Sequence, residues 1–230
     1  MARLLALDTS AEACSVALLD GDNVLEEFAL TPRGHTEHIL PMVEKVLAAS
    51  AYALSSMDAI AFGRGPGSFT GLRIAAGVVQ GLAFGADLSV VPVSSLAAIA
   101  QGFWRTHPEN DSLACVAVDA RMNEVYFGCY QRAGAVVRLV AEERICAPEA
   151  VTLPSYDGTY MGLGSGWEYF PQMDALITQS IVEPYLSCPI HAQDIATLAA
   201  VAWAQGEAVD PVLAQPVYLR NEVSWKKVNQ

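Results

Sequence analysis

Two aspartates that each end a short apolar run are the residues best placed to do chemistry. They are Asp8 and Asp119. A carboxylate at the end of a strand can recruit Mg²⁺ beside the phosphates of a nucleotide. Such a site also needs a glycine two residues later so that backbone amides can reach phosphate, but Ser10 and Arg121 stand at those positions. We therefore expect no working nucleotide site in this chain alone, and we interpret Asp119-Ala120-Arg121 as a turn with a local ion pair.

A glycine-rich loop, Gly63-Arg64-Gly65-Pro66-Gly67-Ser68, is the second candidate for chemistry. It lies between an expected strand and an expected helix, where backbone amides can face an anion. The loop has neither the Lys-Ser/Thr of a Walker motif nor the spacing G-x-G-x-x-G. A tight strand-to-helix connection that uses positive φ is the favoured interpretation, unless a partner brings the ligand.

Histidine and cysteine give no metal site. His35 and His38 are spaced H-x-x-H, which differs from H-E-x-x-H, and no third ligand is evident nearby. We expect this pair to be satisfied or exposed, and we expect no metal, no cofactor and no catalytic residue. The five cysteines form no C-x-x-C pair and are expected to be small core residues in a reduced compartment: Cys14, Cys115, Cys129, Cys146 and Cys188.

The pattern of apolar residues in the first half of the chain predicts an α/β unit that positions these residues. Apolar positions recur with 3/4 spacing over residues 35–50, which predicts a helix. The remaining expected elements are strands at 4–7, 14–19, 24–30, 59–62 and 89–93, and helices at 70–84 and 95–104.

The pattern then restarts after a polar segment at 106–112, which is the expected hinge. Strands are expected at 113–118, 124–130 and 135–140, a helix opening at Pro148, and a further strand entering Gly162-Leu163-Gly164-Ser165-Gly166. A last helix at 190–204 is expected to return to the first unit. The chain thus predicts a first lobe at 1–105, a second lobe at 113–189, and a returning helix and tail at 190–230. This duplicated order resembles the actin/Hsp70/sugar-kinase fold.

Three glycines spaced by four, Gly77, Gly81 and Gly85, fall in or just after the expected helix 70–84. An interior helical glycine costs about 1 kcal/mol relative to alanine. Close approach of another helix would offset that cost, because i, i+4 ridges pack into a neighbour's groove. The neighbour is either helix 35–50 of the same chain or a second protein, and the residues leave this open.

Composition restricts the partners. The 230 residues include 13 Lys plus Arg and 25 Asp plus Glu, which gives a net charge of −12. Such a chain is poorly suited to hold a polyanion by itself. The apolar stretch 74–93 is broken by Gln80 and Asp87, and the first residues lack a signal-peptide pattern, so we expect no membrane span and a cytoplasmic location.

Several strings resemble the TsaB (YeaZ) family over essentially the whole chain. They are Leu4-Leu5-Ala6-Leu7-Asp8-Thr9-Ser10, Arg33-Gly34-His35-Thr36, Gly63 to Arg73, Asp119-Ala120-Arg121 with Glu124-Val125-Tyr126, and Pro216-Val217-Tyr218-Leu219-Arg220-Asn221. The resemblance implies a two-lobed actin-like fold and an accessory role with TsaD, the catalyst, and TsaE, an ATPase. Together they place threonylcarbamoyl on the adenosine beside the anticodon of certain tRNAs. Catalysts of the TsaD type carry H-x-x-x-H on the helix that corresponds to 35–50, so metal and catalysis are not carried over to H-x-x-H.

The resemblance also implies that the first two helices bind TsaD, and that they pair with a second copy when the chain is alone. tRNA would be held only through the complex. The implied contact residues are Ile39, Leu40, Val43, Val46, Leu47, Leu72, Ile74, Gly77, Val78, Gly81, Leu82 and Gly85. The alternatives are a small-molecule kinase of the same fold and, third, a metallopeptidase.

Overall fold

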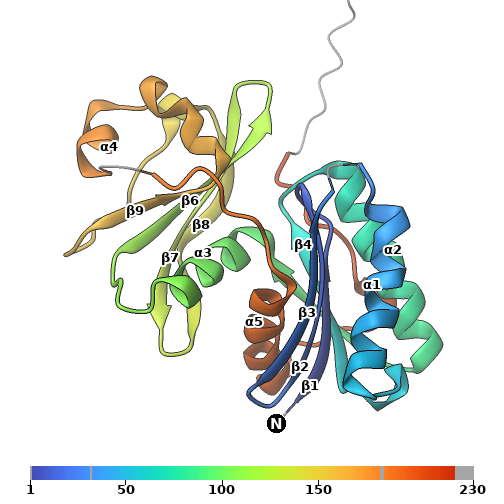
Figure 1. The fold of residues 1–230 in the computed structure, drawn as a ribbon. Coiled ribbons are helices and arrows are strands. Elements are labelled where there is room, and N and C mark those ends of the chain that lie inside the picture. The colour runs from blue at the N-terminus through green and yellow to red at the C-terminus, as the bar shows by residue number, and fades with distance from the viewer. Residues whose placement is uncertain (1, 32, 182–183, 221–230) are drawn as a thin grey trace, which may run out of the picture.

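A computed structural model describes residues 2–31, 33–181 and 184–220, which form two lobes around two sheets (Figure 1). The first sheet has the order β3-β2-β1-β4-β5. Antiparallel pairing joins β1 to β2 and β2 to β3, whereas β4 and β5 run parallel to β1. The strands are β1 (Arg3–Asp8), β2 (Ala13–Asp20), β3 (Asn23–Leu30), β4 (Ala59–Gly65) and β5 (Ser89–Ser94).

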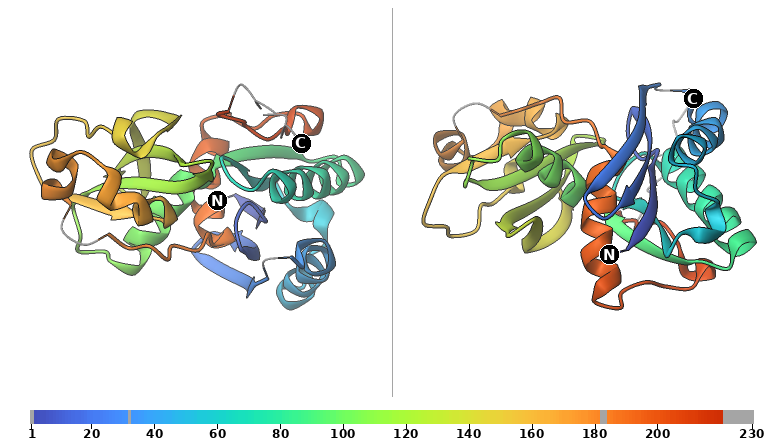
Figure 2. Two further views of the ribbon diagram at one scale, coloured as in Figure 1. Left: turned by 90° about the horizontal axis from the view of Figure 1, so that it is seen from above. Right: turned by 60° about the horizontal axis from the view of Figure 1, so that its bottom comes forward.

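Helices cover both faces of this sheet, as the views in Figures 1 and 2 show. Helices α1 (His35–Ser50) and α2 (Phe69–Ala86) lie on one face, and α3 (Ser95–Thr106) and α5 (Ala192–Ala204) lie on the other. Strands with both faces covered need a nearly continuous apolar run, and β1 and β4 have one that is interrupted only near the strand ends by Arg3, Asp8 and Arg64. The first lobe is therefore a three-layer α/β unit.

The second lobe has a four-stranded sheet of order β8-β7-β6-β9. Its strands are β6 (Leu113–Arg121), β7 (Glu124–Ala133), β8 (Val136–Cys146) and β9 (Tyr160–Leu163). As in the first lobe, an antiparallel meander is followed by a strand parallel to the first one. Helix α3 lies between the two sheets and closes a common core.

The prediction of a helix that begins at Pro148 is wrong. The structure has only a 3₁₀ turn, Pro148–Ala150, and the chain then runs without a helix to β9. Pro154 and Gly158 interrupt this stretch, and no apolar 3/4 pattern is present to form a face. The outer face of the second sheet is covered instead by a 3₁₀ segment, Ser165–Gln172, and the short helix α4 (Ala175–Ser180). The two halves thus share their sheet topology but not their helices.

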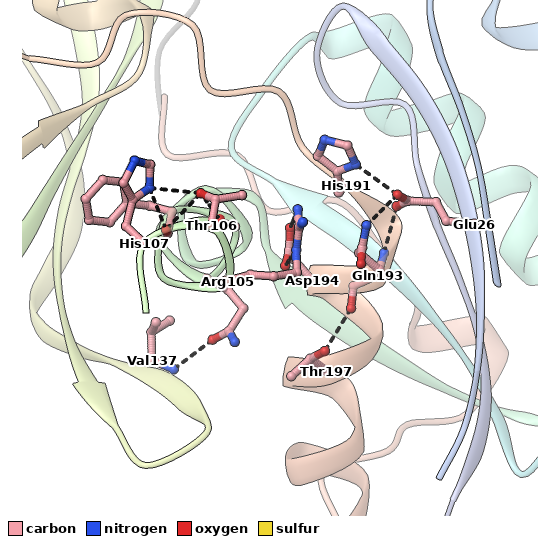
Figure 3. A network of polar contacts seen from close by, with 12 residues as sticks. Glu26, Arg105, Thr106, His107, Val137, His191, Gln193, Asp194 and Thr197 are labelled. Carbon is pink, nitrogen blue, oxygen red and sulfur yellow. Dashed lines mark hydrogen bonds and ion pairs between the residues drawn. The ribbon is translucent and has the colours of Figure 1, made fainter. Parts of the chain in front are cut away.

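Helix α5 is fixed to the first lobe by a polar network (Figure 3). Glu26 of β3 accepts hydrogen bonds from Gln193 N and Gln193 Nε2, and it pairs with His191 Nδ1 at 2.9 Å. The buried carboxylate of Asp194 is held by Arg105 of α3 in a two-bond ion pair with distances of 2.8 and 3.0 Å. Geometry of this kind satisfies a carboxylate that has left water, so α5 becomes part of the first lobe.

Candidate functional site: a closed carboxylate and an open helix face

Asp8, at the end of β1, is fully buried and is already engaged within the chain. Its two carboxylate oxygens accept hydrogen bonds from the Ser10 amide at 2.9 Å and from the Ser10 hydroxyl at 2.9 and 3.0 Å. Burial raises the pKa of Asp8 to about 7, and the two Ser10 bonds lower it only in part. The side chain therefore has no open path to a cation or a phosphate in this arrangement.

The glycine loop packs directly on the residues that follow Asp8. A Cβ at Gly63 would overlap the Asp8 carboxylate, and one at Gly71 would overlap the carbonyl oxygen of Thr9. The Ser68 amide donates to the Ser10 carbonyl at 2.7 Å, and the Thr9 hydroxyl donates to the Gly71 carbonyl. The loop is thus a tight strand-to-helix connection, as the favoured interpretation held. Gly65, at φ +101°, supplies the positive φ.

Asp119, at the corresponding place in β6, is also engaged locally. Its carboxylate pairs with Arg121 Nη1 at 3.0 Å and accepts a hydrogen bond from the Tyr169 hydroxyl. Its amide donates to Ser165 Oγ. The predicted turn with a local ion pair is confirmed.

His35 and His38 differ in their surroundings, and the expectation of a satisfied or exposed pair holds for His38 and only in part for His35. His35 is buried and its Nδ1 has no hydrogen-bond partner among the described residues; burial lowers its pKa, and a hydrogen bond with the Ala11 backbone opposes that shift. His38 is exposed. Within the described ranges, no group of three or more His, Cys, Asp or Glu side chains could hold a metal ion.

The glycine stripe of α2, which we define as Gly77, Gly81 and Gly85, faces open space. No described atom lies within 4 Å of the position that a Cβ would take at any of the three. The interpretation in which helix 35–50 packs on this stripe within the chain is therefore wrong. Phe84 lies beside the stripe with 84% of its surface exposed.

Four of the implied contact residues are not on the surface. Ile39, Val43 and Val46 are buried in the core between the sheet and its helices, and Leu72 is buried beside Gly65 of the glycine loop, so the four cannot meet a partner in this structure. The apolar 3/4 spacing marks the face that a helix turns to its own sheet. Leu40 is exposed at 47%. The other implied contact residues with large side chains are partly buried: Leu47, Ile74, Val78 and Leu82.

One face of α2 is exposed, and it carries two residues, Arg73 and Phe84, that were not among the expected contact residues. Arg73, Phe84 and Gly77 share a face of α2 with Gly81, because seven and four residues bring the chain back to the same side. The sequence signal that could have indicated this face is an aromatic residue, Phe84, among glycines that are spaced by four in the same helix. We call Arg73, Gly77, Gly81, Phe84 and Gly85 the α2 face.

Helix α2 is also apolar as a whole. Among the described residues, it is the one helix whose length and composition would allow it to cross a membrane, although 33% of it is buried in this fold. Its buried side packs on β4. Composition alone therefore does not distinguish a membrane-spanning helix from one that is buried on one side and exposed on the other. The apolar character of the exposed side of α2 remains to be explained.

Comparisons with known proteins show which family the chain is similar to. The family model for TsaD, tRNA N6-adenosine threonylcarbamoyltransferase, matches residues 26–201. The "tRNA threonylcarbamoyladenosine biosynthesis protein TsaB" of Escherichia coli is 42% identical over 98% of both chains, and that of Bacillus subtilis is 28% identical over 96% of this chain and 97% of its own. A solved structure called YeaZ from Pseudomonas aeruginosa is 47% identical, with a TM-score of 0.89 over 95% of this chain and 100% of that one.

The fold is α/β of the actin/Hsp70/sugar-kinase type, as expected from the duplicated order of strands. Identity and coverage extend over both lobes, so they do not reflect a shared lobe alone. The chain belongs to the TsaB (YeaZ) family.

Proposed function

We propose that this chain is a non-catalytic subunit required for threonylcarbamoylation of the adenosine beside the anticodon of tRNA. A TsaD-type protein is its catalytic partner and a TsaE-type ATPase completes the system. The relatives that carry the name of this biosynthesis support the pathway. One observation supports the accessory role: the carboxylate site at Asp8 is closed, whereas the α2 face is open and apolar.

The state of the two strand-end aspartates supports a role without chemistry in this chain. A group that binds Mg²⁺ and phosphate must be ionised and reachable. Asp8 is buried with a pKa raised to about 7, and Asp119 is paired with Arg121. The glycine loop does not cradle an anion in this structure but is packed on Ser10.

The α2 face supports binding to another protein. Glycines without neighbours lower the stability of a helix and leave its backbone open to close approach. Phe84 adds a large apolar side chain that the fold leaves in water. Helices whose backbones approach at small residues gain dense contacts, so a partner helix would gain most from this surface.

The same surface would allow self-association when the catalytic partner is missing. Two copies related by a twofold axis would present identical α2 faces, which makes the contact isologous. The homodimer and the complex with the TsaD-type partner would then exclude each other. tRNA would be reached only through the complex, since this chain has a net charge of −12.

An omission experiment tests the proposal. Purified TsaD-type and TsaE-type proteins, tRNA, ATP and the threonylcarbamoyl donor are mixed with or without this chain, and modified nucleosides are measured by mass spectrometry after digestion. We expect modification to require the chain, and Gly81→Leu to fail as omission does. Gln179→Leu adds the same side chain to exposed helix α4 and should stay active. Full modification without the chain would refute the proposal.

A further inference from the structure

Arg64, in the glycine loop, and Arg73, near the start of α2, take no part in the closed carboxylate site, and Arg64 also lies outside the α2 face. Arg64 reaches from the first lobe to the second, where its Nη2 lies 3.7 Å from Glu143 Oε2. Glu143, on β8, is only 9% exposed at its side chain. Its other oxygen accepts hydrogen bonds from the Tyr130 hydroxyl, at 2.5 Å, and from the hydroxyl of Ser94. Ser94 also caps helix α3 of the first lobe, so one carboxylate of the second lobe contacts two residues of the first.

The segment 217–220 makes a second connection between the same lobes. The Val217 amide donates to the Arg64 carbonyl at 2.8 Å. Tyr218 accepts a hydrogen bond from Arg73 Nε at 3.2 Å, and the Arg73 guanidinium lies 3.6 Å from the centre of the Phe69 ring. These contacts hold the segment to the first lobe and to the first turn of α2.

The far end of the segment reaches the second lobe. Arg220 Nη1 pairs with Glu124 Oε2 at 2.5 Å, and Nη2 donates to the Ala120 carbonyl at 3.2 Å. Ala120 and Glu124 flank the turn between β6 and β7. Within four residues, the chain therefore passes from the α2 end of the first lobe to the hairpin of the second.

We propose that Arg64, Glu143 and the segment 217–220 form an interlobe brace that fixes the second lobe relative to the α2 face. Arg64 joins the two connections, because its guanidinium faces Glu143 while its carbonyl holds Val217. A single partly exposed ion pair contributes little to stability. Two connections that share a residue restrict a hinge more than either does alone, because opening the lobes must break both. This inference concerns the isolated chain and does not depend on the proposed function.

Exchange of the Val217 amide with deuterated water, measured residue by residue by NMR, tests the brace. Arg220→Ala removes the contact with the second lobe but leaves the Val217 hydrogen bond itself unaltered. Glu143→Gln removes the charge facing Arg64, while its amide oxygen can still accept from Tyr130 and Ser94. We expect each variant to exchange Val217 about fivefold faster. Arg138→Ala, which removes an exposed arginine that donates to Gln131 Oε1 within the second lobe, should leave the rate unchanged.

Small-angle X-ray scattering gives an independent readout of lobe position. A chain that ends at Gln215 lacks the segment, and a chain that ends at Arg220 is its matched control. We expect a larger radius of gyration only for the shorter chain. Equal radii for the two chains, or Val217 exchange in Arg220→Ala equal to that in Arg138→Ala, would overturn the brace. Should the shorter chain fail to fold, the exchange rates of the point variants decide.

Discussion

At the scale of single residues, burial decides which of the chemically attractive side chains can act. Asp8 stands where a cation-binding carboxylate would stand, yet it is enclosed by Ser10, Gly63 and the helix that begins at Ser95. Its neighbours from these elements are uncharged, and the nearby Cys14 has its pKa raised to about 11 by burial and by Asp8 itself. No positive charge among the described residues offsets the loss of water around the Asp8 carboxylate, so its neutral form is favoured.

The first prediction concerns the pH dependence that follows. Folding raises the pKa of Asp8 from 3.8 to about 7, so between these values the folded state binds more protons than the unfolded state. Stability contributed by neutral Asp8 is therefore present at low pH and is lost as pH rises towards 7. Asp8→Asn stays neutral throughout. We expect its free energy of unfolding, relative to the parent, to gain roughly 2–4 kcal/mol between pH 4 and pH 8.

Urea denaturation at a series of pH values measures this difference. Asp22→Asn, the same change in an exposed turn, controls for the altered net charge. A difference between Asp8→Asn and the parent that stays constant with pH would mean that folding leaves the pKa of Asp8 unchanged, so that its carboxylate is ionised over most of the range from pH 4 to pH 8. A cation or phosphate site there would then regain its plausibility.

At the scale of elements, the sequence predicts helices better than it predicts what they contact. The 3/4 spacing of apolar residues gives α1 its correct bounds, His35–Ser50, and α2 within two residues. Four residues that the family resemblance implied as partner contacts are buried within the first lobe instead: Ile39, Val43, Val46 and Leu72. A periodic pattern shows that a face will be buried but not by what.

The glycines of α2 show the converse. Gly63 of β4 and Gly71 and Gly77 of α2 are the same residue type, yet the first two are required for close packing on Asp8 and Thr9, and a Cβ at the third would meet no described atom. The contacts that distinguish them join residues more than 50 positions apart, so local spacing carries no record of them. The same limit applies to the lobe contacts of Arg64 and Arg220, which depend on how the two sheets are placed.

The second prediction follows from the open stripe. Gly81→Ala should stabilise the monomer by about 0.5–1 kcal/mol, because alanine is a better helix former and its Cβ meets no described atom. Gly81→Leu should also fold, since the space is open, but it should prevent close approach of a partner helix. Thermal unfolding and analytical ultracentrifugation, alone and with a TsaD-type protein, measure the two effects.

Gly71→Ala is the contrasting variant, because its Cβ would overlap the Thr9 carbonyl. We expect it to destabilise the chain strongly. Normal association by Gly81→Leu, with the monomer still folded, would exclude the α2 face as the contact. Unfolding of Gly81→Leu would mean that the stripe is covered within the chain.

At the scale of the whole molecule, duplication and charge set what the chain can do. The two sheets share the order of a meander followed by a parallel strand, but the outer face of the second sheet is covered by a 3₁₀ segment and the short helix α4 in place of long helices. Pro154 and Gly158 lie in the stretch 151–159, where a crossover helix would otherwise lead to β9, and the structure has no helix there. The lobe that keeps its helices also presents the α2 face, while the chain as a whole is acidic at −12. Such a molecule is suited to bind protein and not nucleic acid.

The last prediction is therefore that the chain alone does not bind the tRNA whose modification it supports. Phosphate contacts require clustered Lys and Arg, and here 25 acidic side chains oppose 13 basic ones over the full sequence. Fluorescence anisotropy with labelled tRNA should show no saturable binding at about 150 mM salt, and only weak binding at about 50 mM. A TsaD-type protein should bind the labelled tRNA, and this chain should change the affinity of the TsaD-type protein for tRNA only through the contact between the two proteins. The Gly81→Leu variant should no longer change that affinity, whereas the Gln179→Leu variant should change it as the parent chain does. Saturable binding by the isolated chain that weakens steeply with salt would show that it grips phosphate itself, and its role would then have to include holding the substrate.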